Sequence, residues 1–446
     1  MIMMMRMSGD FARALTLLLL CASVCLWIRT DRWLDGLHAS SGSPVSGGAR
    51  SLHGHADRNS PKTFRALLAL PGAQAAVRAG GKATRTRARA RARGGPEVLS
   101  AALRKTRDET NETHTRASST QSRGRNVTAS SAGLLQDGVF WSEWLEDLLP
   151  SAFTEQRARA WRDGVRDRSV VVLESGCGRP SNRLAVFADG ARACVRYGIS
   201  AEQVQGETLS YYLATLLGIG NLPPLALSRL DPTGEQWAAV TDSMGALQWA
   251  VSSLVSLTEW IPGLTGAVVP GPLRQGGEGL HPLREDLLSA TVTELLELVE
   301  WSDLIAFDFL TANFDRLASN LFSLQWDPRA TERNVSNLHK TPSGRLLFID
   351  NEAGLVHGYR VLRMWERYHA TALGALCVFR RETARRVSRL HSLRDVRQRL
   401  LALLRDNEPL APELGFLSDE HAEILQSRID ILHEHIQRCK AKYSST

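Results

Sequence analysis

The stretch Phe307-Asp-Phe-Leu-Thr-Ala-Asn-Phe-Asp-Arg-Leu-Ala-Ser-Asn320 sets the order of elements in the second half of this chain. It closes a helix that opens at the capping box Thr291-x-x-Glu294, whose side chains satisfy free amide groups of the first turn. A loop over 311–319 follows, and hydrophobic runs predict two short strands over 320–325 and 346–349. Polar residues therefore fall at the ends of neighbouring elements, where folding can bring them together.

These polar residues have the spacing of a phosphoryl-transfer site. Asp315 and Asn320 match the Asp-x-x-x-x-Asn spacing of a kinase catalytic loop, and Asp350 follows a hydrophobic strand, where kinases hold a metal ligand. A transferred phosphate is negatively charged, so divalent cations with oxygen ligands must neutralise it. We predict that Asp315 is the base for the acceptor hydroxyl and that Asp350 and Asn320 bind metal. Glu352 is either a further metal ligand or a turn residue, and Asp308 is predicted to be a structural partner at the end of the helix.

The segment before this region is rich in strand signals. A β-rich run over 169–173 precedes the turn Gly176-Cys-Gly178, which is a candidate, though short, phosphate-binding turn. Asp189-Gly190 predicts a hairpin. A helix is predicted over 202–217, with Gly218 just past its end.

We therefore predict a two-lobed α+β fold. The small β-rich N-lobe spans 134–262, and the mainly helical C-lobe spans 263–446. The last helices of the C-lobe are predicted over 382–405 and 419–439, the latter with one apolar face. The 313 residues from 134 onward are enough for one catalytic domain of this kind.

Residues 1–33 have the pattern of a targeting segment. Arg6 and Arg13 precede an apolar run over 14–28, which Arg29 closes. The run is shorter than the roughly 20 residues that cross a bilayer comfortably, so it resembles a signal peptide or a short signal anchor. We expect a cytoplasmic tail and a type II anchor with a luminal C-terminus, with a cleaved signal as the alternative. Short anchors suit thin early-secretory membranes, which points to the Golgi.

Residues 34–133 are rich in Gly, Ser, Ala, Arg and Thr and are predicted to form a disordered, basic luminal stem. Residues 29–133 hold 19 basic and 7 acidic side chains, whereas the net charge of the whole chain is only +7. The remainder is acidic overall, which disfavours a nucleic-acid enzyme. Three sequons predict glycosylation and support a luminal location; their acceptors are Asn111, Asn126 and Asn334.

Four cysteines outside the apolar run can pair in three ways in an oxidising lumen. We expect Cys177 to pair with Cys194 and Cys377 with Cys439, because each pair lies within one predicted lobe. Four buried free thiols are the alternative. The spacing of these cysteines does not match a zinc motif.

Three blocks resemble a known family; they are Asn313-Phe-Asp-Arg316, Phe348-Ile-Asp-Asn-Glu-Ala-Gly354 and Ala193-Cys-Val-Arg-Tyr-Gly198. They are similar to the Four-jointed box family of secretory-pathway proteins over roughly 170–440, and more distantly to the Golgi casein kinase group. The resemblance implies a bilobal atypical protein-kinase-like fold and a type II Golgi membrane protein that is sometimes released. It also implies Ser/Thr kinase activity with ATP and Mg²⁺ or Mn²⁺.

The resemblance also implies partners. The founding member of the family phosphorylates extracellular cadherin repeats of Fat and Dachsous and so alters their binding in planar cell polarity. Vertebrate relatives are described as secreted signals that restrain dendrite growth. A catalytically weak or inactive secreted ligand is therefore the alternative to a kinase. A Golgi glycosyltransferase is a third possibility, although residues 134–446 contain no Asp-x-Asp motif.

Carried over by motif, the resemblance makes Asp315 the catalytic base and Asp350 a metal ligand. Glu207 would be the acid of the helix that faces the nucleotide. Arg196 stands where kinases have a lysine on the third strand. Arginine keeps the charge and can bind phosphate with two donors, but it is larger and differently shaped. This substitution leaves a weak kinase or a pseudokinase open.

Overall fold

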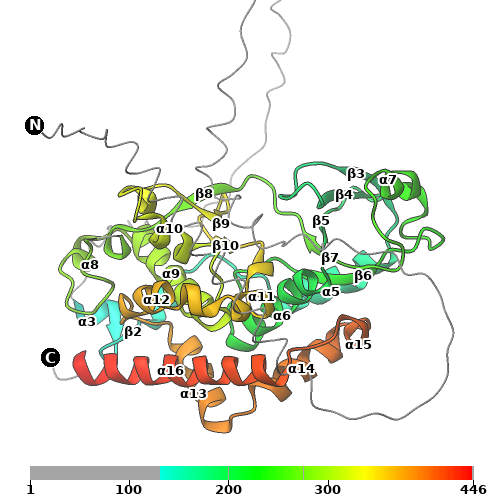
Figure 1. Ribbon diagram of the computed structural model, residues 1–446. Helices are drawn as coiled ribbons and strands as arrows, with labels where there is room; N and C mark the ends of the chain where they lie inside the picture. Colours follow the sequence, from blue (N-terminus) through cyan, green and yellow to red (C-terminus); the bar gives the residue numbers. More distant parts are fainter. Residues whose placement is uncertain (1–130, 199, 275, 444–446) are drawn as a thin grey trace, which may run out of the picture. The chain divides into compact units, whose positions relative to one another are not determined.

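The structure, a computed structural model, describes residues 131–198, 200–274 and 276–443. Two separate clusters of buried side chains divide this part into a small strand-rich lobe and a large helical lobe, as predicted (Figure 1). The strands are β1 (Leu135–Gln136), β2 (Phe140–Trp141), β3 (Val170–Glu174), β4 (Arg183–Phe187), β5 (Arg192–Tyr197), β6 (Leu225–Arg229), β7 (Leu254–Glu259), β8 (Thr265–Val268), β9 (Asn334–Lys340) and β10 (Leu346–Phe348).

The helices differ widely in length. They are α3 (Ser131–Leu134), α4 (Glu143–Asp147), α5 (Glu155–Asp167), α6 (Ala201–Leu217), α7 (Thr241–Ala246), α8 (Asp286–Ser289), α9 (Val292–Thr311), α10 (Leu317–Ser323), α11 (Val356–Arg360), α12 (Leu362–Gly374), α13 (Arg381–Leu393), α14 (Val396–Asn407), α15 (Ala411–Leu414) and α16 (Asp419–Tyr443). Short 3-10 helices include η3 (Ala330–Glu332) and η4 (Asn351–Ala353).

The small lobe is built on a five-stranded antiparallel sheet in the order β3-β4-β5-β7-β6. The predicted hairpin joins β4 to β5: Gly190 has φ +84°, and the backbone N–H of Ala191 donates to the side chain of Asp189 at 3.0 Å. Such a left-handed position suits glycine, which has no Cβ to clash. Trp161 of α5 covers one face of the sheet, and its indole N–H donates to the carbonyl of Leu257.

Helix α6 connects the two lobes. It ends as predicted at Gly218, which has φ +74° and caps the helix in the left-handed conformation. Its side chains are buried along most of its length, mainly in the core of the large lobe, and it also contacts β7. Because both lobes pack on it, α6 can place a side chain between them.

The large lobe surrounds α9, whose predicted capping box is present: Thr291 accepts from the N–H of Glu294, and Glu294 accepts from the N–H of Thr291 at 2.8 Å. A three-stranded sheet in the order β10-β9-β8 packs beside it. The long helix α16 lies against α13 and α9, with the predicted apolar face buried (Figure 1).

Two expectations about elements were wrong. Residues 320–325 do not form a strand, because α10 covers 317–323 and the strand that pairs with β10 is β9. The single helix expected over 382–405 is interrupted at Arg394, which has φ +50°, and so forms α13 and α14. Short apolar runs do not distinguish strand from helix, and the helical pattern continues across a one-residue break.

The start of the small lobe also differs from the expected boundary at residue 134. Phe140 forms a bridge with Phe379, and the N–H of Trp141 donates to the carbonyl of Phe379 at 3.0 Å. The indole of Trp141 donates to Ser302 of α9. These contacts place residues 134–147 in the large lobe, because their apolar side chains complete its core rather than that of the small sheet.

Both expected disulfides are present. Cys177 is bonded to Cys194 within the small lobe, with the Cα atoms 5.6 Å apart. Cys377 is bonded to Cys439 in the large lobe, with the Cα atoms 5.3 Å apart. The second bond ties α16 to the segment before α13.

The expected tail and anchor over 1–33, the stem over 34–133 up to residue 130, and the sequons at Asn111 and Asn126 lie outside the described residues. Within the described part, no helix is both long enough and apolar enough to span a bilayer. Asn334 is exposed at the start of β9, and its side-chain amide lies against Gly266 of β8. Its glycosylation stays a prediction.

We expect the two disulfides to differ in their effect on stability. They close segments with sequence separations of 62 and 17 residues, and chain entropy predicts losses of about 4 and about 3 kcal/mol when each is removed. Urea unfolding under non-reducing conditions of Cys377→Ser/Cys439→Ser and Cys177→Ser/Cys194→Ser would measure this. A greater loss for the 177–194 pair would contradict the expectation.

Candidate active site

Arg196 stands at the centre of the candidate site. It lies on β5, and its buried side chain is surrounded by three of the predicted carboxylates. Its Nη1 is 2.5 Å from Oδ1 of Asp350 and 3.9 Å from Oε2 of Glu352, and its Nε is 3.6 Å from Oε2 of Glu207. The structure therefore brings together residues of β5, α6 and the segment after β10.

Glu207 reaches this site because α6 approaches the segment after β10 closely. A Cβ at Gly206 would lie 3.0 Å from the carbonyl oxygen of Glu352 and 3.1 Å from that of Gly354. A larger residue would push the helix away. Glycine is unfavourable inside a helix. Close packing against the segment after β10 explains why a glycine stands at this position, next to Glu207. Ser210, one turn further along, donates to the carbonyl of Asn351.

Asp350 follows β10 in an unusual backbone conformation. It has φ +56° and ψ 57°, in the left-handed region that L-residues other than Asn, Asp and Gly seldom occupy. Such positions cluster at functional sites, where the surrounding structure maintains them. The 3-10 turn η4 begins at the next residue and returns the buried Glu352 to the same site.

Asp315 lies in the turn between α9 and α10. Its N–H donates to Oδ1 of Asn313, and its Oδ2 accepts from Nδ2 of Asn337, both at 3.0 Å. Burial and the nearby negative charge of Asp350 raise the pKa of Asp315 to about 6. A carboxylate with a pKa near neutral pH is well matched to accept a proton from a hydroxyl as it reacts.

Arg316 connects this turn to the segment that holds Asp350. The side chain is fully buried, and its Nε donates to both carboxylate oxygens of Asp308 at 3.0 and 3.1 Å. Its Nη1 donates to the carbonyl of Ile349 at 3.2 Å and to Oδ1 of Asn351 at 2.9 Å. Asp308 is thus a structural partner at the end of α9, as predicted.

Asn320 is not placed as its predicted role required. It lies in α10, and its Nδ2 donates to the carbonyl of Ala330 at 2.7 Å. The argument for Asn320 as a metal ligand relied on a strand that the structure does not have. The amide beside Asp315 belongs to Asn337 of β9 instead.

The glycine turn lies beside the carboxylates. Gly176 and Gly178 have φ +122° and +79°, and a Cβ at Gly178 would be 4.0 Å from Oδ2 of Asp350. The disulfide of Cys177 fixes this turn to β5, two residues before Arg196. Arg179 follows, and its Nη2 is 2.5 Å from Oε1 of Glu352.

The charges at the site are poorly balanced. Burial, then the charge of Asp350, raises the pKa of Glu352 to about 7. Burial also raises the pKa of Glu207, against the effect of Arg196. Burial alone would lower the pKa of Arg196, but Asp350, Glu207 and Glu352 raise it. The four carboxylates of the site, which include Asp315, therefore outnumber Arg179 and Arg196, the two arginines that form ion pairs there.

This arrangement fits a divalent cation. Oε2 of Glu207 is buried and has no hydrogen-bond partner among the described residues. Carboxylate oxygens are the ligands that Mg²⁺ and Mn²⁺ prefer. Glu207, Asp350 and Glu352 are the residues that could hold such an ion, and Arg196 and Arg179 could bind phosphate oxygens.

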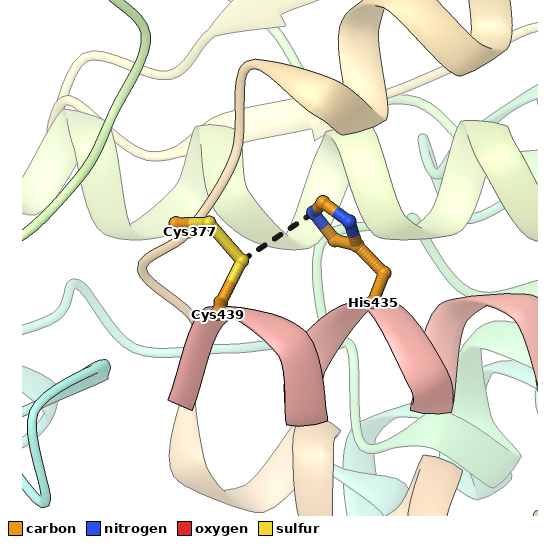
Figure 2. A group of neighbouring side chains, drawn as sticks. All are labelled: Cys377, His435 and Cys439. Carbon is orange, nitrogen blue, oxygen red and sulfur yellow. Dashed lines mark hydrogen bonds between the residues drawn. A yellow bond between two sulfur atoms is a disulfide. The ribbon is translucent and has the colours of Figure 1, made fainter. Parts of the chain in front are cut away.

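A second group of metal-binding residue types lies far from this site. The ligand atoms of Cys377, His435 and Cys439 are all within 4.8 Å of one another. Figure 2 shows the bonded sulfur atoms of the two cysteines beside the ring of His435. The two sulfur atoms are bonded to each other, so neither is a thiolate that could bind metal. His435 contacts the carbonyl of Leu376 at 2.7 Å. We interpret this group as a structural disulfide beside a histidine.

Three residues of the site were not assigned a role from the sequence. Arg316 belongs to the Asn-Phe-Asp-Arg block. Its position next to Asp315 is the only sequence feature that could have indicated a role at the site. Asn337 and Arg179 have no local pattern that marks them, since each reaches the site through the pairing of distant segments.

Comparison with known proteins identifies the family of this chain. A family model described as the Four-jointed box protein middle domain matches residues 156–442. Four-jointed box protein 1 of Xiphophorus maculatus is 53% identical over 436 residues, covering 97% of this chain and 98% of that protein. The extracellular serine/threonine protein kinase four-jointed of Drosophila melanogaster is 35% identical over 365 residues, covering 69% of this chain and 62% of that one. The Golgi casein kinase with Mn and ADP bound has a TM-score of 0.44 at 13% identity, covering 64% of this chain and 77% of that one.

Loss of Arg316 should be strongly destabilising. Arg316→Met leaves the buried Asp308 without its cation, and we expect the free energy of unfolding to fall by about 3–5 kcal/mol. Asp308→Asn/Arg316→Met should lose less than the sum of the single variants, because no buried charge remains. The exposed Arg329→Met is the control, with an expected change below about 0.5 kcal/mol. Additive losses in urea unfolding would contradict the pairing.

The raised pKa of Asp315 predicts how stability depends on pH. Folded Asp315 binds its proton more tightly than the unfolded chain does, so its ionisation costs stability as the pH rises from about 4 to about 6. Asp315→Asn should therefore be more stable than the wild type at pH 7.5, by up to about 3 kcal/mol. The difference should narrow at pH 5. Thermal unfolding without divalent cations would test this, and a difference that widens at pH 5 would contradict it.

Proposed function

The chain belongs to the Four-jointed box family, and on this basis we propose that it is a secretory-pathway Ser/Thr protein kinase. The observation that carries the proposal is the convergence of Asp350, Glu352 and Glu207 around one buried arginine, Arg196, with Asp315 close enough to Asp350 to be affected by its charge. The name of the Drosophila relative, an extracellular serine/threonine protein kinase, supports the same activity. The cofactors would be ATP and Mg²⁺ or Mn²⁺.

Each residue would have a distinct task. Glu207, Asp350 and Glu352 would hold a divalent cation, which when bound supplies positive charge to the phosphates. Arg196 would leave Asp350 and bind a phosphate oxygen with its two Nη groups. Asp315 would accept the proton of a serine or threonine hydroxyl. The bond from Asn337 to Oδ2 would orient this carboxylate, so that Oδ1 faces the acceptor.

We propose cadherin-repeat ectodomains of the Fat and Dachsous type as acceptors, and planar cell polarity and cell–cell signalling as the processes affected. This part of the proposal comes from the family. The chain would act in the Golgi lumen as a type II membrane protein, or outside the cell after release. The disulfides of the described part are compatible with an oxidising lumen.

One observation favours the second candidate, a weakly active or inactive secreted ligand that restrains dendrite growth. Arg196 is 2.5 Å from Asp350, so a metal ion must compete with a guanidinium for its ligand. A lysine would present a single ammonium group on a more flexible stem. The Arg196–Asp350 contact could therefore slow or prevent catalysis.

A phosphate-transfer assay separates the two candidates. The full chain is given ATP, Mn²⁺ and isolated cadherin repeats, and incorporated phosphate is measured. We expect transfer by the wild type and a loss of at least about 100-fold in Asp315→Asn and Asp350→Ala, which lack the base and a metal ligand. Asp242→Ala, an exposed acid of α7, should match the wild type.

Arg196→Lys shows whether the arginine limits the reaction. If Arg196 restrains the wild type through Asp350, the lysine variant should transfer phosphate faster. Wild-type transfer no greater than that of Asp350→Ala would exclude the kinase. A signalling effect that persists in Asp350→Ala would then support the ligand.

A further inference from the structure

A row of aromatic rings begins next to Asp315 and leads away from it. Phe314 is stacked on Trp365, with ring centroids 5.0 Å apart, and is 5.5 Å from the ring of His357. Trp365 contacts Phe322 at 5.1 Å, and Phe322 contacts Trp326 at 4.8 Å. We call these five residues the aromatic row. Three of them, Phe314, Phe322 and Trp365, pack with Tyr368 in a small hydrophobic cluster apart from the two lobe cores.

The row is partly open to solvent. Trp365 is 8% exposed and forms its floor, whereas His357, Phe314 and Phe322 are half-buried and Trp326 is 69% exposed. A single exposed tryptophan is common, but Trp326 continues a set of stacked and edge-on rings, and covering its exposed surface would be favourable. Aromatic side chains of this kind supply much of the binding energy at protein interfaces.

One end of the row adjoins the candidate active site. Phe314 directly precedes Asp315. Burial lowers the pKa of His357, and the positive charge of Arg179 lowers that pKa further. The four centroid steps span at most about 20 Å, which is the length of about six residues of extended chain. An acceptor segment bound along the row would therefore pass beside Asp315.

Positive charge lies in the segments that carry the row. Arg329 follows Trp326 by three residues, and Arg363 and Arg367 stand on either side of Trp365 in the sequence. All three are exposed, and none of them has an ion-pair partner among the residues that the structure describes. The guanidinium of Arg367 lies over the ring of Tyr368, 4.5 Å from its centroid, and Tyr368 itself packs on Phe322. The neighbouring acids Asp327 and Glu366 are paired with Arg333 and Arg428.

We propose that the aromatic row is the docking surface for the acceptor polypeptide, which is an extended segment with acidic residues around its serine or threonine. The inference rests on the proposed kinase function and adds the class of substrate. Apolar side chains of the segment would cover Trp326 and Phe322. Acidic side chains would meet Arg329, Arg363 and Arg367.

The test compares two exposed tryptophans in the full chain. Trp326→Ala removes the open end of the row, and Trp144→Ala removes a tryptophan of α4 that is 50% exposed. The acceptor is a ten-residue peptide with one serine among aspartates and glutamates, and with two leucines that can cover Trp326 and Phe322. We expect Trp326→Ala to raise the KM for the peptide by about 10-fold or more, with kcat and the KM for ATP unchanged. Trp144→Ala should match the wild type.

Charge-reversal variants test whether the preferred peptide is acidic. Arg367→Glu should weaken use of the acidic peptide and improve that of a matched peptide with lysines and arginines, whereas Arg438→Glu, on the exposed face of α16, should do neither. Equal KM values for Trp326→Ala and Trp144→Ala would overturn the proposal. A wild-type preference for the basic peptide would also overturn it.

Binding without transfer separates this inference from the proposed function. Fluorescence anisotropy of the labelled acidic peptide needs no phosphate transfer. We expect the wild type to bind the peptide and Trp326→Ala to bind it at least about 10-fold more weakly. This result would support the docking surface even if the chain transferred no phosphate. Absence of wild-type binding overturns it. A dimer in light scattering that Trp326→Ala dissociates would also overturn it, because the row would then join two copies of the chain.

Discussion

The buried guanidinium of Arg316 holds the candidate site together. Through Asp308 it is attached to the end of α9, and through Ile349 and Asn351 it is attached to both sides of Asp350. The turn with Asp315 and the segment with Asp350 therefore cannot move independently. A fully buried charge is tolerated only when it is paired and hydrogen-bonded. Arg316 must therefore keep these bonds, and so it holds the two segments in a fixed relation.

Around this connector, the protein maintains an excess of negative charge that destabilises the folded chain. Asp315, Glu207 and Glu352 all have raised pKa values, chiefly because burial removes the water that would stabilise their charges. Stability is commonly lost in this way where a site must bind a cation. Arg196 and Arg179 offset part of the charge, so nucleotide and metal would have to displace existing ion pairs.

Local patterns predicted much of the fold. The hairpin at Asp189-Gly190, the capping box at Thr291 and the left-handed cap at Gly218 depend on residues close in sequence, and all three are present. Predictions failed where distant packing decided the outcome. The residues after Asn320 have an apolar run that suits a strand or a helix, and contacts with α12 select the helix. Trp141 and its neighbours belong to the large lobe because their apolar side chains pack in the core of that lobe.

Several residues of the candidate site could be predicted from the sequence. Asp315 and Asp350 could be named from spacing and from their place after a helix and a strand, and the family resemblance added Glu207 and Arg196. Their roles stay predictions. The partners could not be named. Asn337 reaches Asp315 through strand pairing, and Arg179 reaches Glu352 because the glycine turn is held to β5. Such contacts join segments far apart in sequence, and only the burial of two hydrophobic cores brings those segments within reach of each other.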